Sequence, residues 1–351
     1  MDDPKSSGPP DFCTERERPA ILADRPCLAL ANLPTPIELL ARFSKALGGP
    51  QIWIKRDDLT GLATGGNKAR KLEFLIGDAL SQGADAVITA GGPQSNHCRQ
   101  TAAAAARAGI ECHLVFGGSS DRPLIGNRFL DWLLGAQEHW TPKGTRDAKM
   151  ADLAQELAGK GKRPYVIPVG GSNSVGALGY VAAMYELRWQ LDQISRRFDH
   201  LVFATSSGGT QAGVVVGAKL TNCESKIIAI SIDQVPDGTS SFDYKAFVLS
   251  IAQGVNADLD LGLTLSLADF PIQYDYLGQG YGVVGDPERE AIKFLAQTEG
   301  ILVDPVYAGR ALAGLIDLVR RQKIKQDETV LFWHTGGETA LHAYVDDLVG
   351  R

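Results

Sequence analysis

Short apolar segments that end in glycine alternate with segments of helical character along most of this chain. One example is ADAVITAGG (84–92), which is followed by the alanine-rich segment CRQTAAAAARAG (98–109). Buried strands that alternate with helices are typical of a parallel sheet covered by helices on both faces. We therefore predict an α/β fold in which ligands bind at the loops after the strands. Similar apolar segments lie at 110–118, 163–171, 200–218, 225–233 and 328–338, and a further helical segment lies at 177–191.

Two segments near the carboxyl end of the chain carry less regular signals. DPEREAIKFLAQTEG (286–300) predicts a helix with Asp286 as its cap, Pro287 at its first position and Gly300 at its end. DLDLGLTLSLADF (258–270) predicts another helix, with undefined ends. The 351 residues suffice for one large domain or two modest ones. No shift in composition marks a linker, so two interleaved sub-domains fit as well as two in tandem.

The overall composition excludes several classes of protein. A net charge of −6 argues against a nucleic-acid-binding protein, and no stretch approaches the roughly 18 apolar residues of a membrane span. Residues 1–20 are polar and lack the apolar core of a secretory signal, so we expect a disordered tail there. The five cysteines form no CxxC pair and the six histidines show no metal spacing. This pattern predicts a reduced, cytoplasmic protein without a metal site.

The segment TSSGGTQAG (205–213) is the strongest local signal for a ligand site. It follows an apolar strand and precedes a helical segment. Backbone N–H groups and hydroxyls at such a turn hold a phosphate without needing a lysine, and the helix dipole adds to the attraction. The segment matches neither a P-loop nor GxGxxG. An ordinary glycine-rich turn is the alternative.

Two further turns between strand and helix carry polar residues. GGPQSNHCRQ (91–100) places Gln94, Ser95, Asn96 and His97 at a helix start, where they suit a carboxylate. A helix cap explains either Ser95 or Asn96, but not four polar residues in a row. WHTGGETALHAY (333–344) places Thr335 at the edge of the sheet, before a predicted helix; a cap is the alternative there.

TGGNKARKLEF (64–74) places Lys68 at a helix start, behind two glycines. An ammonium is electrostatically unfavourable at that end of a helix. A lysine that forms a Schiff base with the aldehyde of pyridoxal phosphate avoids this cost, and a buried lysine readily loses its proton. A phosphate turn, a carboxylate turn and one loop lysine together indicate a pyridoxal phosphate enzyme. Tyr281 and Tyr307 lie in other loops, where tyrosines more often pack than catalyse.

These segments together resemble the family of D-cysteine desulfhydrases and 1-aminocyclopropane-1-carboxylate deaminases, which belongs to the tryptophan-synthase-β-like class of pyridoxal phosphate enzymes. The matching motifs occur in the family's order from about residue 30 to 345. They include IWIKRDDLTGLATGGNKARKLEFL (52–75), QSNHCRQTAAAAARAG (94–109), VGGSNSVGALGYV (169–181), DPVYAGR (304–310) and HTGGETAL (334–341).

The resemblance implies two open, twisted and mostly parallel sheets flanked by helices, with the cofactor in the cleft between two domains. The large domain would comprise residues 21–70 and 180–351, and the small domain residues 71–179. The resemblance also implies a homodimer that acts on a small amino acid.

The resemblance assigns a role to each matching residue. Lys68 would hold the cofactor covalently and remove the Cα proton. Ser95, Tyr281 and Tyr307 would complete the catalytic set. The other residues predicted to bind the cofactor are Asn67, Asn96, Ser207, Gly208, Gly209, Thr210 and Thr335, and those predicted to bind the substrate are Gln94, Ser95, Asn96 and His97.

Two positions bear on the choice of reaction. The cyclopropane deaminases carry glutamate and leucine where this chain has Ala308 and Thr335. A threonine near the pyridine nitrogen makes a weaker electron sink than a carboxylate would, which favours expulsion of a good leaving group over opening of a cyclopropane. The desulfhydrases usually have serine at position 308, so the sulfur substrate stays open at this point.

We therefore predict a lyase that converts D-cysteine to pyruvate, hydrogen sulfide and ammonia. L-Cysteate sulfo-lyase and 1-aminocyclopropane-1-carboxylate deaminase are the alternative activities. A binding protein with a vestigial site is disfavoured by the intact Lys68 and phosphate turn, and a nicotinamide-linked oxidoreductase by the missing GxGxxG.

Overall fold

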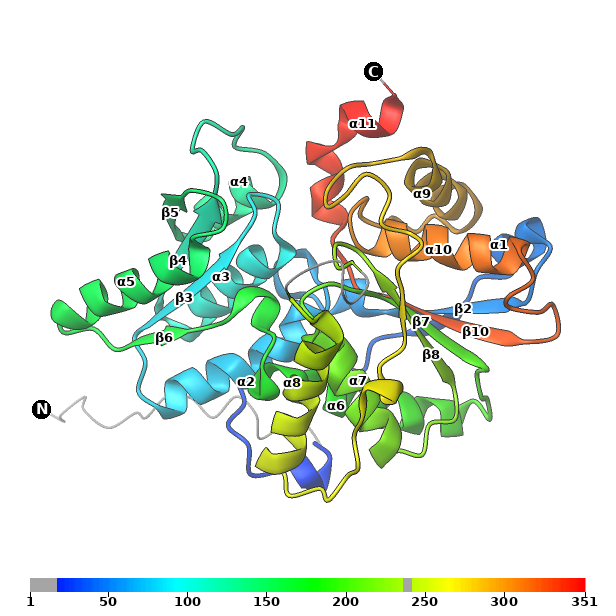
Figure 1. Ribbon diagram of the computed structural model, residues 1–351, viewed down its shortest axis with the longest axis horizontal. Coiled ribbons are helices and arrows are strands. Elements are labelled where there is room, and N and C mark those ends of the chain that lie inside the picture. The colour runs from blue at the N-terminus through cyan, green and yellow to red at the C-terminus, as the bar shows by residue number, and fades with distance from the viewer. Residues whose placement is uncertain (1–17, 236–241, 351) are drawn as a thin grey trace, which may run out of the picture.

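The structure is a computed structural model that describes residues 18–235 and 242–350. The predicted tail at 1–20 lies almost wholly outside the described residues. Two separate sheets organise the fold, with the smaller one and its helices in the left half of Figure 1 and the larger one in the right half. The predicted class, with two mostly parallel sheets flanked by helices, is confirmed.

The larger sheet has six strands in the order β1-β2-β10-β7-β8-β9. Only β1 runs antiparallel to its neighbour, and the other pairs are parallel. Strands β2 and β10 are adjacent although they are far apart in sequence, since Thr329 pairs with Gln51. The strands are β1 (Ile37–Leu39), β2 (Gln51–Arg56), β7 (His200–Thr205), β8 (Lys226–Ser231), β9 (Ile272–Gln273) and β10 (Thr329–His334).

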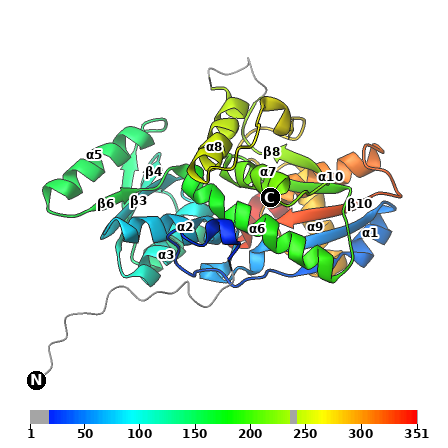
Figure 2. The ribbon, with the colours of Figure 1, turned by 90° about the horizontal axis from the view of Figure 1, so that it is seen from below.

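Both faces of the larger sheet are buried, as expected for parallel strands. Along β10, Val330 and Phe332 pack into one apolar cluster, while Leu331 and Trp333 pack into another on the opposite face. This alternation follows from the two-residue period of a strand. Helices α1, α9 and α10 cover the first face, and α6 and α7 cover the second (Figures 1 and 2). Their bounds are α1 (Ala41–Leu47), α6 (Ser174–Gln193), α7 (Gly209–Leu220), α9 (Asp286–Glu299) and α10 (Ala308–Arg320).

The smaller sheet has four parallel strands in the order β5-β4-β3-β6. Its strands are β3 (Ala86–Gly91), β4 (Glu111–Gly117), β5 (Gln137–Thr141) and β6 (Pro164–Val166). The associated helices are α2 (Lys68–Ser81), α3 (Asn96–Ala108), α4 (Gly126–Leu133) and α5 (Arg146–Gly159). Strand β5 and helices α4 and α5 were not predicted, because 137–141 lacks a clear apolar run. The division into two domains stays a proposal, and its limits at 70/71 and 179/180 fall inside α2 and α6.

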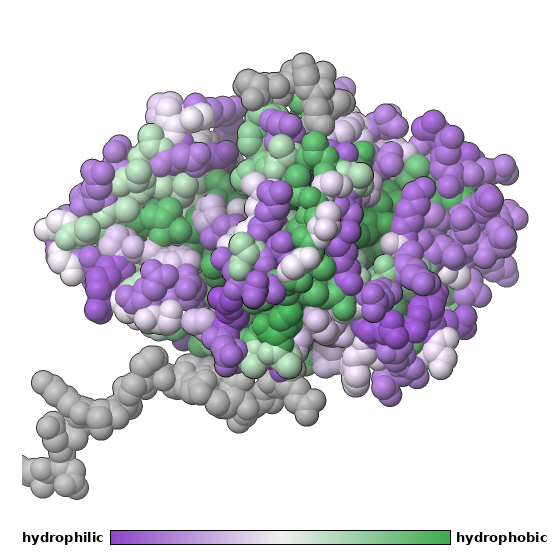
Figure 3. Space-filling view, turned by 60° about the horizontal axis from the view of Figure 1, so that its bottom comes forward, coloured by the Kyte–Doolittle hydropathy of each residue, from purple (hydrophilic) through white to green (hydrophobic). Residues whose placement is uncertain are grey.

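The prediction of a helix at 258–270 is wrong. Helix α8 (Tyr244–Asp258) ends where that segment begins, and only a 3₁₀ turn at Leu267–Asp269 follows. The leucines at 259, 261, 263 and 265 alternate with polar residues or glycine, which is the period of an extended chain. All four pack against the apolar cluster beneath α8. In the view of Figure 3, hydrophobic residues lie over the middle of the visible face of the molecule, and hydrophilic residues lie over its right-hand end.

The two remaining predictions for helix ends need small corrections. Helix α9 is capped by Gly285, not Asp286, and Pro287 is its second residue. The Glu288 carboxylate accepts the N–H of Gly285 and so occupies the helix start. Gly300 ends the helix in the left-handed region, as predicted. The helix predicted after Thr335 is a 3₁₀ turn (Glu338–Ala343), with the short α11 (Val345–Val349) beyond it.

Candidate active site

A cavity of about 300 Å³ lies between the two sheets. Its walls come from the loops after β3, β6, β7, β8, β9 and β10, and from the starts of α2, α5 and α10. Within each sheet the parallel strands point their carboxyl ends to one edge. The loops at these two edges meet across the cavity although they are distant in sequence. The volume is in the range of sites for small molecules.

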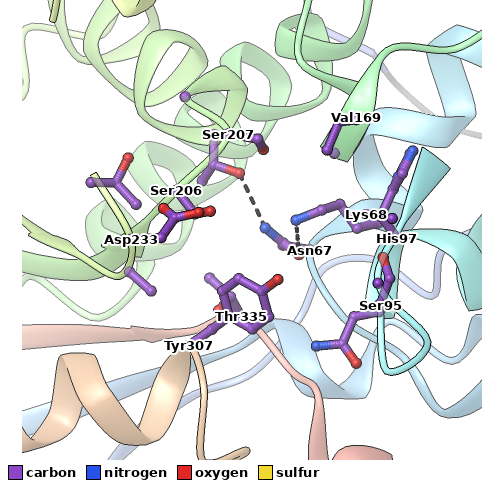
Figure 4. A pocket seen from close by; sticks show the side chains of 18 of the residues that line it. Asn67, Lys68, Ser95, His97, Val169, Ser206, Ser207, Asp233, Tyr307 and Thr335 are labelled. Carbon is purple, nitrogen blue, oxygen red and sulfur yellow. Dashed lines mark hydrogen bonds between the residues drawn. The ribbon is translucent and has the colours of Figure 1, made fainter. Parts of the chain in front are cut away.

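Lys68 is the first residue of α2 and lines this cavity. Gly65 and Gly66 precede it with φ of 79° and 127°, a region that glycine adopts readily. The Lys68 Nζ donates to Asn67 Oδ1 at 3.0 Å, as the dashed line in Figure 4 shows. Burial lowers the pKa of Lys68 to about 8, against an opposing effect of Asp304. The amine is therefore far easier to deprotonate than an ordinary lysine.

The turn between β7 and α7 forms the opposite wall. Ser207, Gly208 and Thr210 line the cavity, and Gly208 caps α7 with φ of 85°. The Asn67 amide donates to Thr210 Oγ1 at 3.1 Å, which joins this turn to the residue before Lys68. The Gly209 N–H instead donates to Ser172 Oγ at 3.1 Å, and Gly209 is not among the lining residues.

The sequence analysis missed Lys71, which lies one helical turn after Lys68. Its buried Nζ donates to the Gly170 carbonyl at 3.0 Å and to Ser172 Oγ at 3.2 Å. Ser172 Oγ in turn donates to Ser207 Oγ at 2.8 Å. Burial, and then the charge of Lys68, hold the pKa of Lys71 well below its ordinary value. No carboxylate pairs with Lys71 among the described residues. The spacing from Lys68 on one helix face was the available signal.

The loop after β3 brings three of its four predicted residues to the cavity. Ser95, Asn96 and His97 line it, and the Ser95 hydroxyl caps α3 by accepting the N–H of Cys98 at 3.2 Å. Gln94 is not among the lining residues. Its side-chain amide bonds the backbone of Ile125 and Asn127, so it holds the start of α4.

His97 is neutral and has a defined tautomer. Thr89 donates its hydroxyl to the Ile167 carbonyl, so it must accept the proton on His97 Nε2 at 2.8 Å. Burial, with the charges of Lys68 and Lys71, holds the pKa of His97 well below its ordinary value. His97 therefore lines the cavity with a neutral ring whose Nδ1 is an acceptor without a hydrogen-bond partner, and it adds no positive charge.

Tyr281 and Tyr307 meet at the mouth of the cavity. Their hydroxyl oxygens lie 2.6 Å apart, and their rings pack edge to face. Asp304 fixes the Tyr307 backbone, because its buried carboxylate accepts the N–H groups of Val306, Tyr307 and Ala308. Burial, then the neighbouring Tyr281, raise the pKa of Tyr307 well above its ordinary value. Tyr307 is thus a protonated donor at neutral pH.

Thr335 also lines the cavity, together with two charged residues that the sequence analysis missed, Asp233 and Arg146. Asp233 follows β8 and lies near Ser206 in Figure 4. Burial is the main cause that raises its pKa. Arg146 begins α5. Neither lies in a motif, and the loops that carry them converge only in the folded chain.

Comparison with known proteins identifies the family. A model of pyridoxal-phosphate-dependent enzymes matches residues 28–336. This chain belongs to that family. D-Cysteine desulfhydrases of Salmonella newport (strain SL254) and Salmonella enteritidis PT4 are each 43% identical over 91% of this chain and 96% of their own length.

Solved structures agree with this assignment. A structure described as an ACC deaminase homologue matches with a TM-score of 0.85 and 36% identity, over 94% of this chain and 98% of its own. An O-ureido-L-serine synthase matches with a TM-score of 0.65 at 17% identity, over 91% of this chain and 93% of its own, and shows the fold alone. The predicted family and cofactor are confirmed.

The residues that line the cavity, with Lys71 directly behind them, fit pyridoxal phosphate. Lys71 is a buried amine whose hydrogen-bond partners are neutral, and it lies next to serines and the start of α7. A phosphate bound there would supply the missing negative charge. Gly170 lies in the loop after β6, next to Ser207. A Cβ on Gly170 would lie 2.1 Å from Ser207 Oγ, so only glycine fits at this position. The reactive amine of Lys68 lies across the same cavity. No helix of the described residues is long and apolar enough to cross a membrane.

Proposed function

We propose that this enzyme eliminates the thiol of D-cysteine to give pyruvate, hydrogen sulfide and ammonia. The observation that carries the proposal is the buried Lys68 amine, with a pKa lowered to about 8, opposite a phosphate-binding turn. The preference for the D-enantiomer rests on the desulfhydrase relatives from Salmonella, which cover nearly the whole chain.

Pyridoxal phosphate supplies an aldehyde for the lysine and the substrate amine, and a ring that accepts the electrons left on Cα. Lys68 would hold the cofactor covalently, and its Nζ, when free, would remove the Cα proton of the substrate. Asn67 accepts from Lys68 Nζ and so orients it in either state. A proton transfer by a positioned amine of suitable pKa contributes about 10²- to 10⁴-fold to a rate.

The phosphate would lie in the turn of Ser207, Gly208 and Thr210, with Lys71 behind it. Gly209, which was predicted to bind the cofactor, contributes its N–H to Ser172 instead and so shapes the turn. Thr335 would face the pyridine nitrogen and Asn96 the ring oxygen. Ser95 and the start of α3 would bind the substrate carboxylate, because unpaired N–H groups at a helix start attract anions.

The tyrosine pair would give the leaving sulfur its proton. Tyr307 is held protonated, and Tyr281 lies within hydrogen-bond distance to replace the proton that Tyr307 loses. The products balance as hydrogen sulfide and 2-aminoacrylate, and water converts the latter to pyruvate and ammonia. Gln94 and His97 complete the loop without supplying charge.

The cyclopropane substrate fits this cavity less well. Ala308 is buried in the apolar cluster behind α10, so the glutamate of the cyclopropane deaminases has no counterpart here. Asp233 is the only carboxylate among the described residues that line the cavity, and its charge acts on Tyr307. Arg146 lines the same cavity with a positive charge. L-Cysteate, whose sulfonate is always negative, is therefore the rival that the substrate comparison below must decide.

Assembly and location are part of the same proposal. We expect a homodimer, which would cover the exposed apolar side chains of α4, where Trp132 and Leu133 are 60% and 62% exposed. We expect the enzyme to be cytoplasmic, because the cysteines form no CxxC pair.

The test is product release from purified, cofactor-loaded protein offered D-cysteine, L-cysteine, L-cysteate and 1-aminocyclopropane-1-carboxylate separately. Pyruvate with sulfide from D-cysteine alone supports the proposal. Pyruvate with sulfite from L-cysteate, or 2-oxobutyrate from the cyclopropane, would replace it with the corresponding rival activity.

A further inference from the structure

Asn127, on helix α4, is a fully buried polar residue that contacts the 94–96 loop from outside the cavity. It does not line the cavity and lies in no motif of the sequence analysis. Its side chain nevertheless makes three hydrogen bonds, all to residues of the 94–99 segment. The Nδ2 donates to the Gln94 carbonyl and to Asn96 Oδ1, both at 2.8 Å, and the Oδ1 accepts from Arg99 Nη1 at 2.7 Å.

Arg99 fixes the direction of these bonds. A guanidinium has no acceptor, so its Nη1 can contact only the oxygen of the Asn127 amide. The Asn127 NH₂ group must then point the other way, toward Gln94 and Asn96. Arg99 is itself buried and is held by the Gly65 carbonyl, which accepts from Nη2 at 2.7 Å. The orientation of the Asn127 amide therefore follows from the chemistry of its partners.

The Asn127 amide in turn fixes the amide of Asn96. Two donors, Asn127 Nδ2 at 2.8 Å and Arg99 Nη1 at 3.2 Å, converge on Asn96 Oδ1. Turning the Asn96 amide over would place its NH₂ group against both donors. Asn96 Nδ2 has no acceptor among the described residues, and Asn96 lines the cavity. Its NH₂ group is therefore the part available to a ligand.

We propose that Asn127 is a positioning residue that presents the Asn96 NH₂ group, rather than its oxygen, to the ring oxygen of the cofactor. This inference rests on the proposed role of Asn96. A hydrogen-bond donor at the ring oxygen partly neutralises the negative charge of that oxygen. The oxygen then attracts the proton of the neighbouring cofactor nitrogen less strongly, so the nitrogen loses this proton at a lower pH. Loss of the donor raises the pH at which that nitrogen loses its proton, which the visible absorbance of the bound cofactor reports.

The test is N127D in the cofactor-loaded enzyme, without substrate. The carboxylate keeps the acceptor for Arg99 but repels Asn96 Oδ1, so the Asn96 amide turns over and faces the cofactor with its oxygen. We expect the midpoint of the absorbance titration to rise by roughly one to two pH units, the size of a hydrogen bond to a charged group. N256D is the matched control, because Asn256 likewise bonds a backbone segment, at Leu263, far from the cavity. Its midpoint should equal that of the wild type.

A double-mutant cycle separates positioning from a general structural effect. In the N96A background, N127D should leave the midpoint where N96A alone puts it. An unchanged midpoint in N127D, or an equal shift in both backgrounds, would overturn the proposal. If N127D does not fold, N127S is judged by the same two criteria. The titration needs no turnover, so a protein inactive on D-cysteine would fail the proposed function without affecting this test.

Discussion

Two adjacent residues of helix α2 bury positive charge in opposite ways. Arg70 lies in a closed ionic network, where it bonds Asp57 at 2.8 and 2.9 Å and Glu186 at 2.9 Å through two nitrogens. Lys71 is equally buried, but bonds only a carbonyl and a hydroxyl. The protein thus neutralises Arg70 itself, and we propose that a bound phosphate neutralises Lys71.

The pKa values record the same difference. The charges and hydrogen bonds of Arg70 outweigh burial and hold the pKa of Asp57 at about 2, so this carboxylate stays ionised. Burial dominates at Lys68 and Lys71 and lowers the pKa of both. A buried charge without a counter-ion costs stability, which an enzyme tolerates where a bound anion restores the balance. Arg70 is therefore a structural residue, whereas the functional roles that we propose belong to Lys68 and Lys71.

The largest effect is expected from K68A. Removing the amine abolishes covalent attachment of the cofactor and the base, so turnover should fall by more than about 1,000-fold. Visible absorbance and sulfide release measure the two losses. K226A, on an exposed position of β8, is the control. Retained turnover in K68A would contradict the role of this lysine.

R70M should instead weaken the fold. It removes the guanidinium that bonds both Asp57 and Glu186, although Glu186 keeps its ion pair with Lys55. We expect the free energy of unfolding to fall by about 3–5 kcal/mol. Urea denaturation measures the change, with the surface variant D275N as a control. A stable R70M protein would mean that the network contributes little.

K71M sharpens the contrast, because it changes the next residue in the same helix. Losing a charged hydrogen bond to phosphate should weaken cofactor affinity by about 10- to 100-fold, while the free energy of unfolding of the cofactor-free protein changes much less than in R70M. Titration with pyridoxal phosphate measures the affinity. Equal destabilisation by both variants would remove the distinction between the two residues.

The smallest expected effect is on acid stability. The folded pKa of Asp57, about 2, lies below its ordinary value of 3.8. Its contribution is therefore complete above pH 3.8 and is lost as the pH falls from 3.8 toward 2. This amounts to about 2 kcal/mol. Urea denaturation across that range should show a shallower loss of stability in D57N than in the wild type.

Sequence alone predicted the residues that lie in local motifs. Lys68, Ser95, Ser207, Tyr307 and Thr335 each follow a strand or begin a helix in a recognisable turn, and all five line one cavity. The parallel sheets followed from apolar runs in the same way. The helix predicted over 258–270 is wrong, because the leucines of 259–265 alternate with the two-residue period of an extended chain.

Other parts of the site depend on contacts with segments that are distant in sequence. Lys71 matters because Gly170 and Ser172 meet it from another loop. Asn127 lies in a helix with exposed apolar residues and no motif. Gln94 looked like a ligand residue, yet its amide is used by the backbone of α4. Packing determines where a side chain points and which groups it bonds. These properties can therefore be read from the folded chain but not from the sequence.

The pairing of β2 with β10 has a consequence for synthesis on the ribosome. All four strands of the smaller sheet lie within residues 86–166, so they can pair as soon as that stretch has emerged. The larger sheet must wait, because β10 lies between β2 and β7 and is made near the end of the chain. Pairings this distant in sequence close slowly. Until β10 is in place, Thr335 is also missing, so the nascent chain cannot complete its cofactor site before nearly all of it has been translated.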